Sequence, residues 1–276
     1  MCTTCGCGVE NDEVRVDGQV TPARTRVEAV TVLESLLADN DAQASHNRKH
    51  FDAHEVLVIN LMSSPGAGKT ALLEATIQAM GDELRMAVIE GDLETENDAE
   101  RIRRHGVPAI QIATGSACHL DAHMVHDALH QLDLSTVDIV FIENVGNLVC
   151  PASFDLGQHS DIVLLSVPEG DDKPAKYPVM FRTADMVMLS KADLLPVLDD
   201  FNPARAEQYL RNLANPAPLI HTSAKSGDGM ESWLQWLRET VSQHQLALQA
   251  VSPAHAHEHK HDHVSGQHRD PEHSQP

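Results

Sequence analysis

One stretch of the chain, residues 56–70, restricts the fold more than any other. It opens with the apolar run VLVINLM, continues with the turn SSPGAG, and reaches Lys69 and Thr70 just before a helix-forming segment. A buried strand, a glycine-rich turn and a helix start in this order form a phosphate-binding loop, because successive backbone N–H groups and the positive helix end face one anion. The stretch therefore predicts an NTP-binding α/β fold, against the simpler interpretation of a tight turn before a helix.

The loop departs from the motif G-x-x-x-x-G-K-[ST] at one position, where Ser63 replaces the first glycine. Gly66 and Gly68 still allow the backbone to approach a phosphate closely, so we expect the loop to bind phosphate. Lys69 is expected to reach the terminal phosphates, and the Thr70 hydroxyl to bind magnesium. The predicted nucleotide contacts of this loop are Ser64, Gly66, Ala67, Gly68, Lys69 and Thr70.

The rest of the chain alternates short apolar runs with helical segments. Seven apolar runs in all predict an α/β fold in which a mostly parallel sheet is covered by helices on both faces. Ligands in such sheets bind beyond the carboxyl ends of the strands. In addition to the first run, strands are expected at residues 84–90, 108–113, 137–143, 161–167, 184–190 and 218–222. Helices are expected at 96–105, 120–132, 203–213 and 230–244.

Length and charge limit the organisation further. The 276 residues suffice for one α/β domain with terminal extensions. A formal net charge of −21 argues against a nucleic-acid partner, because phosphate backbones are bound by basic surfaces. No apolar run long enough to span a membrane and no secretory pattern are found, so a cytoplasmic protein without a membrane partner is expected. We predict a cysteine-rich leader and polar linker at 1–22, a nucleotide-binding domain at 23–247 that begins with a helix, and a disordered histidine-rich tail at 248–276.

Two carboxylates follow predicted strands on the same side as the phosphate-binding loop. Asp92 lies just after the second strand, and Glu143 ends the fourth. Carboxylates in these places can hold magnesium or its waters, or position an attacking water. We therefore expect Lys69, Asp92 and Glu143 to carry catalysis, and Thr70, Asp92 and Glu143 to surround magnesium. A helix cap or a surface acid is the simpler alternative for each carboxylate.

A base-reading site is predicted from two later loops. Ser190-Lys191-Ala192-Asp193 follows a strand and is similar to the guanine-reading N-K-x-D motif, with Ser190 in place of asparagine. The stem of Lys191 would cover the base, and Asp193 would accept hydrogen bonds from guanine N1 and the exocyclic amine. The loop Ser223-Ala224-Lys225 follows the last strand, where GTPases place an S-A-K loop. Both loops together favour GTP over ATP.

Cysteine and histidine gather after two neighbouring strands. Cys118 and His119 follow the third strand, and Cys150 follows the fourth, only a few residues beyond Glu143. Thiolate and imidazole ligands suit zinc or nickel. Each cysteine alone is interpreted more simply as a small buried apolar residue. If the three bind one ion, a movement of the Glu143 loop would change metal affinity.

Both ends of the chain are predicted to bind metal as well. Cys2, Cys5 and Cys7 form a C-x-x-C-x-C leader whose thiolates can converge on one soft metal at little cost in chain entropy. In the tail, imidazoles on a flexible segment bind nickel, zinc or copper with little selectivity. For three further histidines at residues 46, 50 and 54, we prefer the interpretation of a solvated helix face. The alternating tail histidines are His255, His257, His259, His261 and His263.

These motifs together resemble the hydrogenase nickel-incorporation GTPases of the HypB family, a SIMIBI class of P-loop GTPases. The most specific match is the run ENVGNLVCP at 143–151, and EGDDKPAKYP at 169–178 also matches. The resemblance implies a slow GTPase that inserts nickel during [NiFe]-hydrogenase maturation, using GTP, magnesium, nickel and zinc. It also implies a homodimer that depends on nucleotide and metal, a zinc-binding partner (HypA), and delivery to the hydrogenase large subunit. Leu194 and Leu198 match the start of the family's dimer-forming helix, and the Cys118-His119-Cys150 site matches its dimer interface.

Two alternatives remain open at this point. The related urease-type nickel-insertion GTPases share the phosphate and guanine motifs, but the C-x-x-C-x-C leader and Cys118-His119 are not expected in them. A nickel or zinc storage protein, in which the nucleotide domain only regulates, would instead depend on its tail histidines.

Overall fold

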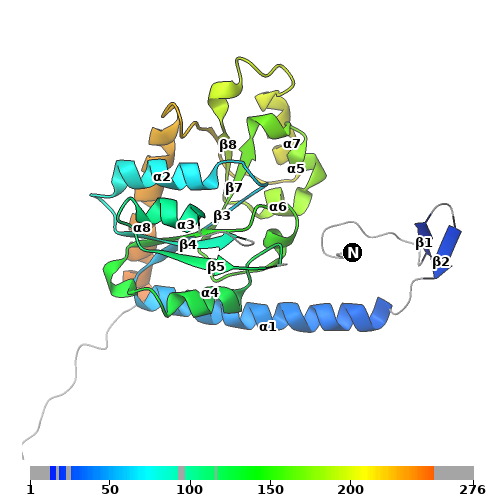
Figure 1. Ribbon diagram of the computed structural model, residues 1–276, viewed down its shortest axis with the longest axis horizontal. Helices are drawn as coiled ribbons and strands as arrows, with labels where there is room; N and C mark the ends of the chain where they lie inside the picture. Colours follow the sequence, from blue (N-terminus) through cyan, green and yellow to red (C-terminus); the bar gives the residue numbers. More distant parts are fainter. Residues whose placement is uncertain (1–12, 17–18, 23–25, 93–96, 116, 252–276) are drawn as a thin grey trace, which may run out of the picture.

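The computed structural model describes residues 13–16, 19–22, 26–92, 97–115 and 117–251, with side chains from Glu34 to Ala250. Its domain is a seven-stranded sheet in the order β5-β4-β6-β3-β7-β8-β9, with helices on both faces (Figure 1). Every neighbouring pair in this sheet is parallel, which confirms the predicted architecture. The strands are β3 (Leu57–Ser63), β4 (Met86–Asp92), β5 (Ala109–Ala113), β6 (Ile139–Glu143), β7 (Ser160–Ser166), β8 (Met186–Ser190) and β9 (Leu219–His221).

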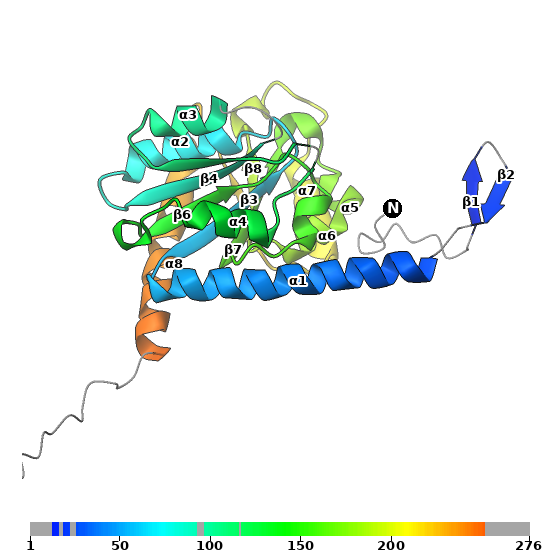
Figure 2. The ribbon, with the colours of Figure 1, turned by 60° about the horizontal axis from the view of Figure 1, so that its bottom comes forward.

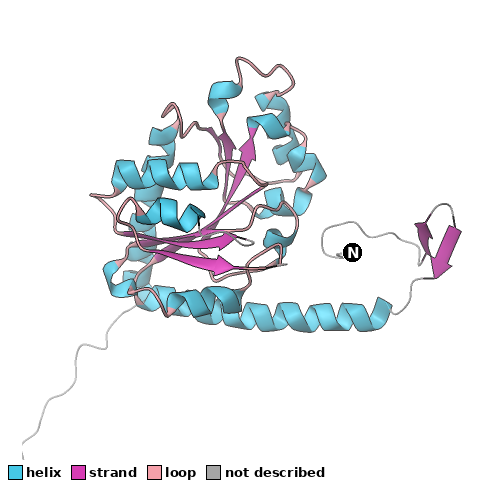
Figure 3. Cartoon of the chain, in the orientation of Figure 1, coloured by secondary structure: helices cyan, strands magenta, loops and turns pink. Residues whose placement is uncertain are grey.

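The central strand β3 is apolar throughout because both of its faces are covered. Its odd-numbered residues Leu57, Ile59 and Leu61 pack with α2, α3 and α8, whereas Val58 packs with α1 and α4. Near β7 and β8, α6 and α7 cover the same face of the sheet that α1 and α4 cover elsewhere. Figure 3 shows the two helix layers around the strands. The helices are α1 (Arg26–Ala53), α2 (Lys69–Met80), α3 (Asn97–Arg103), α4 (Ala122–Leu129), α5 (Lys173–Lys176), α6 (Pro178–Thr183), α7 (Pro203–Asn212) and α8 (Met230–Val251).

The segment before the domain differs from its predicted form. Two short strands, β1 (Glu13–Val16) and β2 (Gln19–Pro22), pair antiparallel within the stretch that we expected to be a polar linker. The helix expected at the start of the domain is α1, which runs to Ala53 because the buried Ala44, Asn47 and Phe51 give its last turns a face to pack. Figure 2 shows α1 lying along α4 and reaching beyond the sheet toward the hairpin.

Two further differences concern the later part of the chain. The residues after Asp193 form the short 3₁₀ helix η5 (Ala192–Leu194) and then turns, so no α-helix starts at Leu194 as the resemblance implied. Helix α8 continues to Val251, past the predicted end of the domain at residue 247. Within the described ranges, no helix is long and apolar enough to cross a membrane.

Candidate nucleotide and metal site

The phosphate-binding loop joins β3 to α2 at the carboxyl edge of the sheet. Gly66 and Gly68 adopt φ angles of 73° and 101°, in a region that other L-residues rarely occupy. Gly68 directly precedes α2, so the helix N-terminus faces the loop. Lys69 donates from Nζ to the Ser63 hydroxyl at 3.3 Å. The residue that replaces the first glycine therefore supplies an acceptor to the loop lysine.

Glu143 lies beside this loop because β6 pairs with β3, with Glu143 opposite Leu61. The Thr70 hydroxyl donates to Glu143 Oε1 at 2.9 Å, and Lys69 Nζ lies 3.8 Å from the same oxygen. The second carboxylate oxygen, Oε2, is buried and has no hydrogen-bond partner among the described residues. Burial raises the pKa of Glu143, while Lys69 acts in the opposite direction.

Glu90 is a further acid that the sequence analysis did not assign to the site. It stands opposite Glu143 on the neighbouring strand β4 and is 2% exposed. Burial, followed by the charge of Glu143, raises the pKa of Glu90 to about 11. The buried pair Glu90 and Glu143 therefore favours retaining a proton, because two charged carboxylates at this spacing would repel each other. The only sequence signal was an acid inside an apolar strand, and its closeness to Glu143 depends on strand order.

These groups fit a magnesium ion. The Thr70 hydroxyl, the Glu143 Oε2 atom and the buried Ser64 Oγ are oxygen ligands of the kind this cation prefers. Asp92 ends β4 at the same edge, and its backbone carbonyl accepts from the amide of Thr114 at 2.9 Å. The predicted acids Asp92 and Glu143 thus end two neighbouring strands at the same edge of the sheet.

A second unassigned acid, Glu169, lies at the other side of the loop. Burial raises the pKa of Glu169, and Ser64, Lys173, Lys191 and Lys69 act in the opposite direction. As a carboxylate, Glu169 would offset part of the positive charge of these three lysines. The sequence contained it only as part of the run at residues 169–178.

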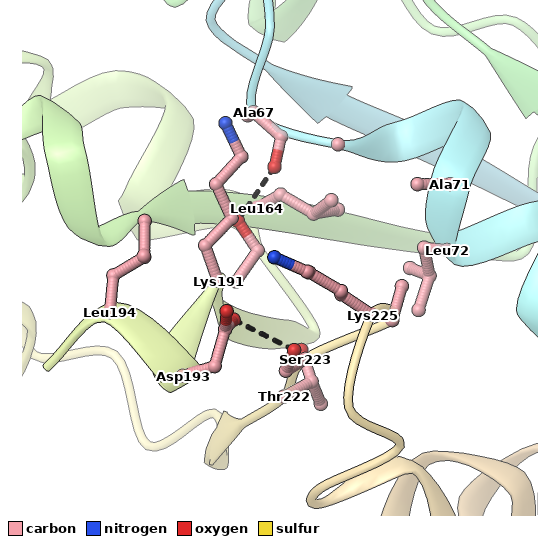
Figure 4. Close-up of a pocket in the computed structure, with 13 residues that line it drawn as sticks. Ala67, Ala71, Leu72, Leu164, Lys191, Asp193, Leu194, Thr222, Ser223 and Lys225 are labelled. Atoms are coloured by element: carbon pink, nitrogen blue, oxygen red, sulfur yellow. Dashed lines mark hydrogen bonds between the residues drawn. The ribbon is translucent and has the colours of Figure 1, made fainter.

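The predicted base-reading loops line one cavity of about 250 Å³ next to the phosphate-binding loop. Figure 4 shows Lys191 and Lys225 extending into the space between the loops, with Asp193 hydrogen-bonded to Ser223. This bond, from Ser223 Oγ to Asp193 Oδ1, measures 2.7 Å and holds the carboxylate in place. The Ser190 hydroxyl donates to the Ala67 carbonyl at 2.7 Å, so the residue that replaces asparagine ties the base loop to the phosphate loop. The predicted residues in the lining are Ala67, Gly68, Lys191, Asp193, Ser223, Ala224 and Lys225.

The structure also brings Cys118, His119 and Cys150 together. Their ligand atoms all lie within 4.8 Å of one another, with Cys118 Sγ 3.0 Å from Cys150 Sγ and 3.8 Å from His119 Nδ1. Burial lowers the pKa of His119, and Asp121 opposes that change. Its ring stacks on Phe154 at a centroid distance of 3.9 Å. Two thiols and a neutral imidazole form a donor set suited to nickel or zinc.

One segment, residues 143–151, connects this metal group to the phosphate-binding loop. Gly146 packs so closely on Pro65 that an added Cβ would lie 2.7 Å from the Pro65 Cα. Asn144 Oδ1 accepts from the Leu120 amide at 3.2 Å, and Asn147 Nδ2 donates to the Cys118 carbonyl at 3.3 Å. The segment therefore touches both the nucleotide loop and the loop that carries Cys118.

A second group with ligand atoms within 4.8 Å lies at the opposite edge of the sheet, where Asp52, His159 and His244 meet. The backbone amide of Val58 donates to His159 Nδ1 at 2.9 Å, and His159 Nε2 lies 3.0 Å from Asp52 Oδ1. A neutral imidazole has one lone pair, which the Val58 amide already occupies. His159 Nε2 therefore carries a proton toward Asp52 and offers no lone pair to a metal.

The remaining predicted metal ligands lie outside the described residues. These are the leader cysteines Cys2, Cys5 and Cys7 and the tail histidines His255, His257, His259, His261 and His263. Their assignment remains a prediction.

The parallel sheet, the glycine loop and the acid on the adjacent strand define a P-loop nucleotide-binding protein. Over residues 57–221 the sequence matches the family described as "CobW/HypB/UreG, nucleotide-binding domain". The chain belongs to this family and, within it, to the hydrogenase maturation factors HypB, as its relatives show.

Three relatives illustrate this membership. The hydrogenase maturation factor HypB of Azotobacter vinelandii is 50% identical over 216 residues, which cover 78% of this chain and 71% of the relative. The factor of the same name from Escherichia coli K12 is 44% identical over 285 residues, covering 86% of this chain and 98% of the relative. The crystal structure of HypB from Helicobacter pylori in complex with nickel superposes with a TM-score of 0.71 at 42% identity, covering 74% and 96% of the two chains.

Proposed function

We propose that this protein is a GTPase that delivers nickel to the large subunit of [NiFe]-hydrogenase during its maturation. One observation carries the proposal: the segment at residues 143–151 contains both Glu143, beside the nucleotide loop, and Cys150, in the metal group. A change of nucleotide at one end of this short segment would move a ligand at the other end. The names of the relatives support hydrogenase as the target.

The nucleotide is GTP in this proposal, bound with magnesium at Thr70 and Glu143. Asp193 is held in the cavity by Ser223 and can accept two hydrogen bonds from guanine, which adenine cannot donate. Among the described residues, the cavity lining contains no arginine or glutamine, and neither contacts Lys69 or Glu143. We therefore expect slow hydrolysis without a partner, since these residues usually stabilise the charge or orient the water.

The proposal also includes partners and a place in the cell. The protein would act in the cytoplasm as a homodimer formed with nucleotide and metal, and would cooperate with the zinc-binding protein HypA. The leader cysteines would hold nickel for delivery, and the tail would store or buffer it. Zinc is the competing occupant of the Cys118-His119-Cys150 group, since the same donors suit both ions.

The test measures nickel and zinc affinity at that group with GDP and with a non-hydrolysable GTP analogue. Cys2, Cys5 and Cys7 are replaced by serine in the full chain, and Cys150→Ser in the same background is the control for metal bound elsewhere. The proposal expects an affinity that differs between the two nucleotides and a difference that disappears in the control. Equal affinities would overturn the switch, and maturation of urease instead of hydrogenase would overturn the target.

A further inference from the structure

Six histidines gather where α1 packs against α4. We call this surface the histidine face. His46 and His50 come from α1 and His54 directly follows it, where the sequence indicated only a solvated helix face. The other three come from α4, which follows the Cys118-His119 loop, and from the residue just after it. They are His123, His126 and His130, the last directly after α4.

Two of these side chains already have the spacing of metal ligands. His126 Nε2 lies 3.2 Å from His130 Nε2, and their ring centroids are 4.7 Å apart. Two imidazoles bound to one ion through bonds of about 2.0–2.1 Å place their nitrogens about 3 Å apart. In the metal-free protein this contact is a hydrogen bond from one Nε2–H to the other ring. A bound ion would replace that proton.

The orientation of His126 is set from the protein interior. Asn47 is fully buried, and its Nδ2 donates to the carbonyls of Ala122 and Leu156 at 2.8 and 3.2 Å. Its amide oxygen therefore points at His126 Nδ1, 3.2 Å away, and can only accept. Nδ1 carries the proton, and the lone pair lies on Nε2. A carbonyl or carboxylate on the second ring nitrogen is the usual partner of a metal-bound histidine.

A third imidazole is within reach from α1. The His46 ring stands edge-on to His126 with centroids 5.2 Å apart. His50 is half-buried, and its pKa is lowered by burial and by His54, His130, His46 and His126. Burial and the charges of His130 and His46 also lower the pKa of His126, while Asp127 raises it. His50 and His126 thus lie where the neutral imidazole is favoured, and Asp127 is close to His126.

We infer that the histidine face is a surface binding site for a borderline divalent cation, Ni²⁺ or Zn²⁺, held by Nε2 of His126 and His130. His46 or His50 completes the site by rotating its exposed or half-buried ring. His130 takes the other tautomer on binding, which its exposed ring can do freely. This site is separate from the Cys118-His119-Cys150 group, and α4 begins just after that group.

The test must separate this site from the other metal ligands of the full chain, so its readout is resolved by residue. Histidine modification by diethyl pyrocarbonate, mapped by mass spectrometry, is measured with and without Ni²⁺ and, separately, Zn²⁺. We expect the metal to slow modification of His126 and His130 but not of the exposed His123 on the same helix. The ¹⁵N shifts of the His126 ring in the metal-free protein should show Nδ1 protonated.

Variants then test the assignment. His130→Ala removes an exposed side chain, and we expect it to weaken metal protection of His126 at least about tenfold. His123→Ala is the matched control and should leave the metal protection of His126 unchanged. Neither variant should change the rate of GTP hydrolysis. His46→Ala and His50→Ala identify the third ligand by which of them weakens protection. Unchanged modification of His126 at saturating metal, or full protection in His130→Ala, would overturn the inference.

Discussion

The two edges of the sheet each gather three potential metal ligands, yet they differ in what their side chains can do. At the carboxyl edge, Cys118, His119 and Cys150 have ligand atoms that point at one another beside the nucleotide loop. At the opposite edge, His159 is held between the Val58 amide and Asp52. Short distances are therefore common to both edges, but at the opposite edge the lone pair of His159 is already taken by the Val58 amide, so this ring cannot bind a metal.

The difference also concerns stability. The Asp52-His159 pair joins α1 to the start of β7, and His244 of α8 packs on the same ring at a centroid distance of 4.2 Å. Burial, followed by the charge of His244, lowers the pKa of His159 to about 4. This edge clamps distant segments together through the neutral imidazole of His159, and we expect mutations there to change folding rather than metal binding.

Lys69→Ala should have the largest effect and should be confined to the carboxyl edge. Removing the loop ammonium takes away charge stabilisation at the terminal phosphates, and we expect GTP hydrolysis to fall about a thousandfold. The measurement is single-turnover hydrolysis, with the exposed Lys176→Ala as control. Metal binding by the leader should be intact; its loss together with hydrolysis would mean that the two regions are coupled.

His159→Gln should change the pH dependence of stability at the other edge. The folded pKa of about 4 lies below the ordinary value of 6.5, so the unfolded chain binds the extra proton between these values. Stability is then complete above about pH 6.5 and falls as pH decreases toward 4, by about 3 kcal/mol at most. Urea unfolding at several pH values should show a flatter profile in the variant. His123→Gln is the control and should keep the pH profile of the parent. A profile of His159→Gln as steep as that of the parent would contradict the role of His159 in stability.

Cys150→Ser should separate the two groups by metal affinity. With the leader cysteines replaced, we expect nickel affinity at the carboxyl edge to fall about a hundredfold, because a thiolate ligand is lost. Asp52→Asn, made in the same background, should leave nickel affinity as it is. The comparison between the edges fails if Asp52→Asn removes an equivalent of bound metal.

Gly146→Ala should give the smallest of these effects and tests the contact inside the carboxyl edge. The new Cβ would meet Pro65 at 2.7 Å from its Cα, so the phosphate loop or the metal loop must shift. Overpacking of this size costs about 1–3 kcal/mol, and we expect GTP affinity to fall about tenfold. Nucleotide and nickel titrations of the same variant would show whether both change. A change in neither would mean that the contact is not part of a switch.

Local motifs were predictable from the sequence, and their surroundings were not. The strand, loop and helix around Lys69 are adjacent in the chain, so spacing alone predicted them. The packing of the last turns of α1 was not predicted, because their anchor, Asn47, bonds to carbonyls at positions 122 and 156. Glu90 was missed for the same kind of reason, since only the pairing of β4 with β6 places it beside Glu143.

The sequence by itself determined how strands and helices alternate along the chain, where the phosphate-binding loop lies, and which residues are available to bind guanine and metal. These follow from periodicity and from motifs a few residues long, which fold through local contacts. Only the tertiary structure decided which ring nitrogen of each imidazole carries the proton. A backbone amide donates to Nδ1 of His159, so the proton of that ring lies on Nε2. The buried oxygen of Asn47 accepts from Nδ1 of His126, so the lone pair of that ring lies on Nε2, where it faces His130.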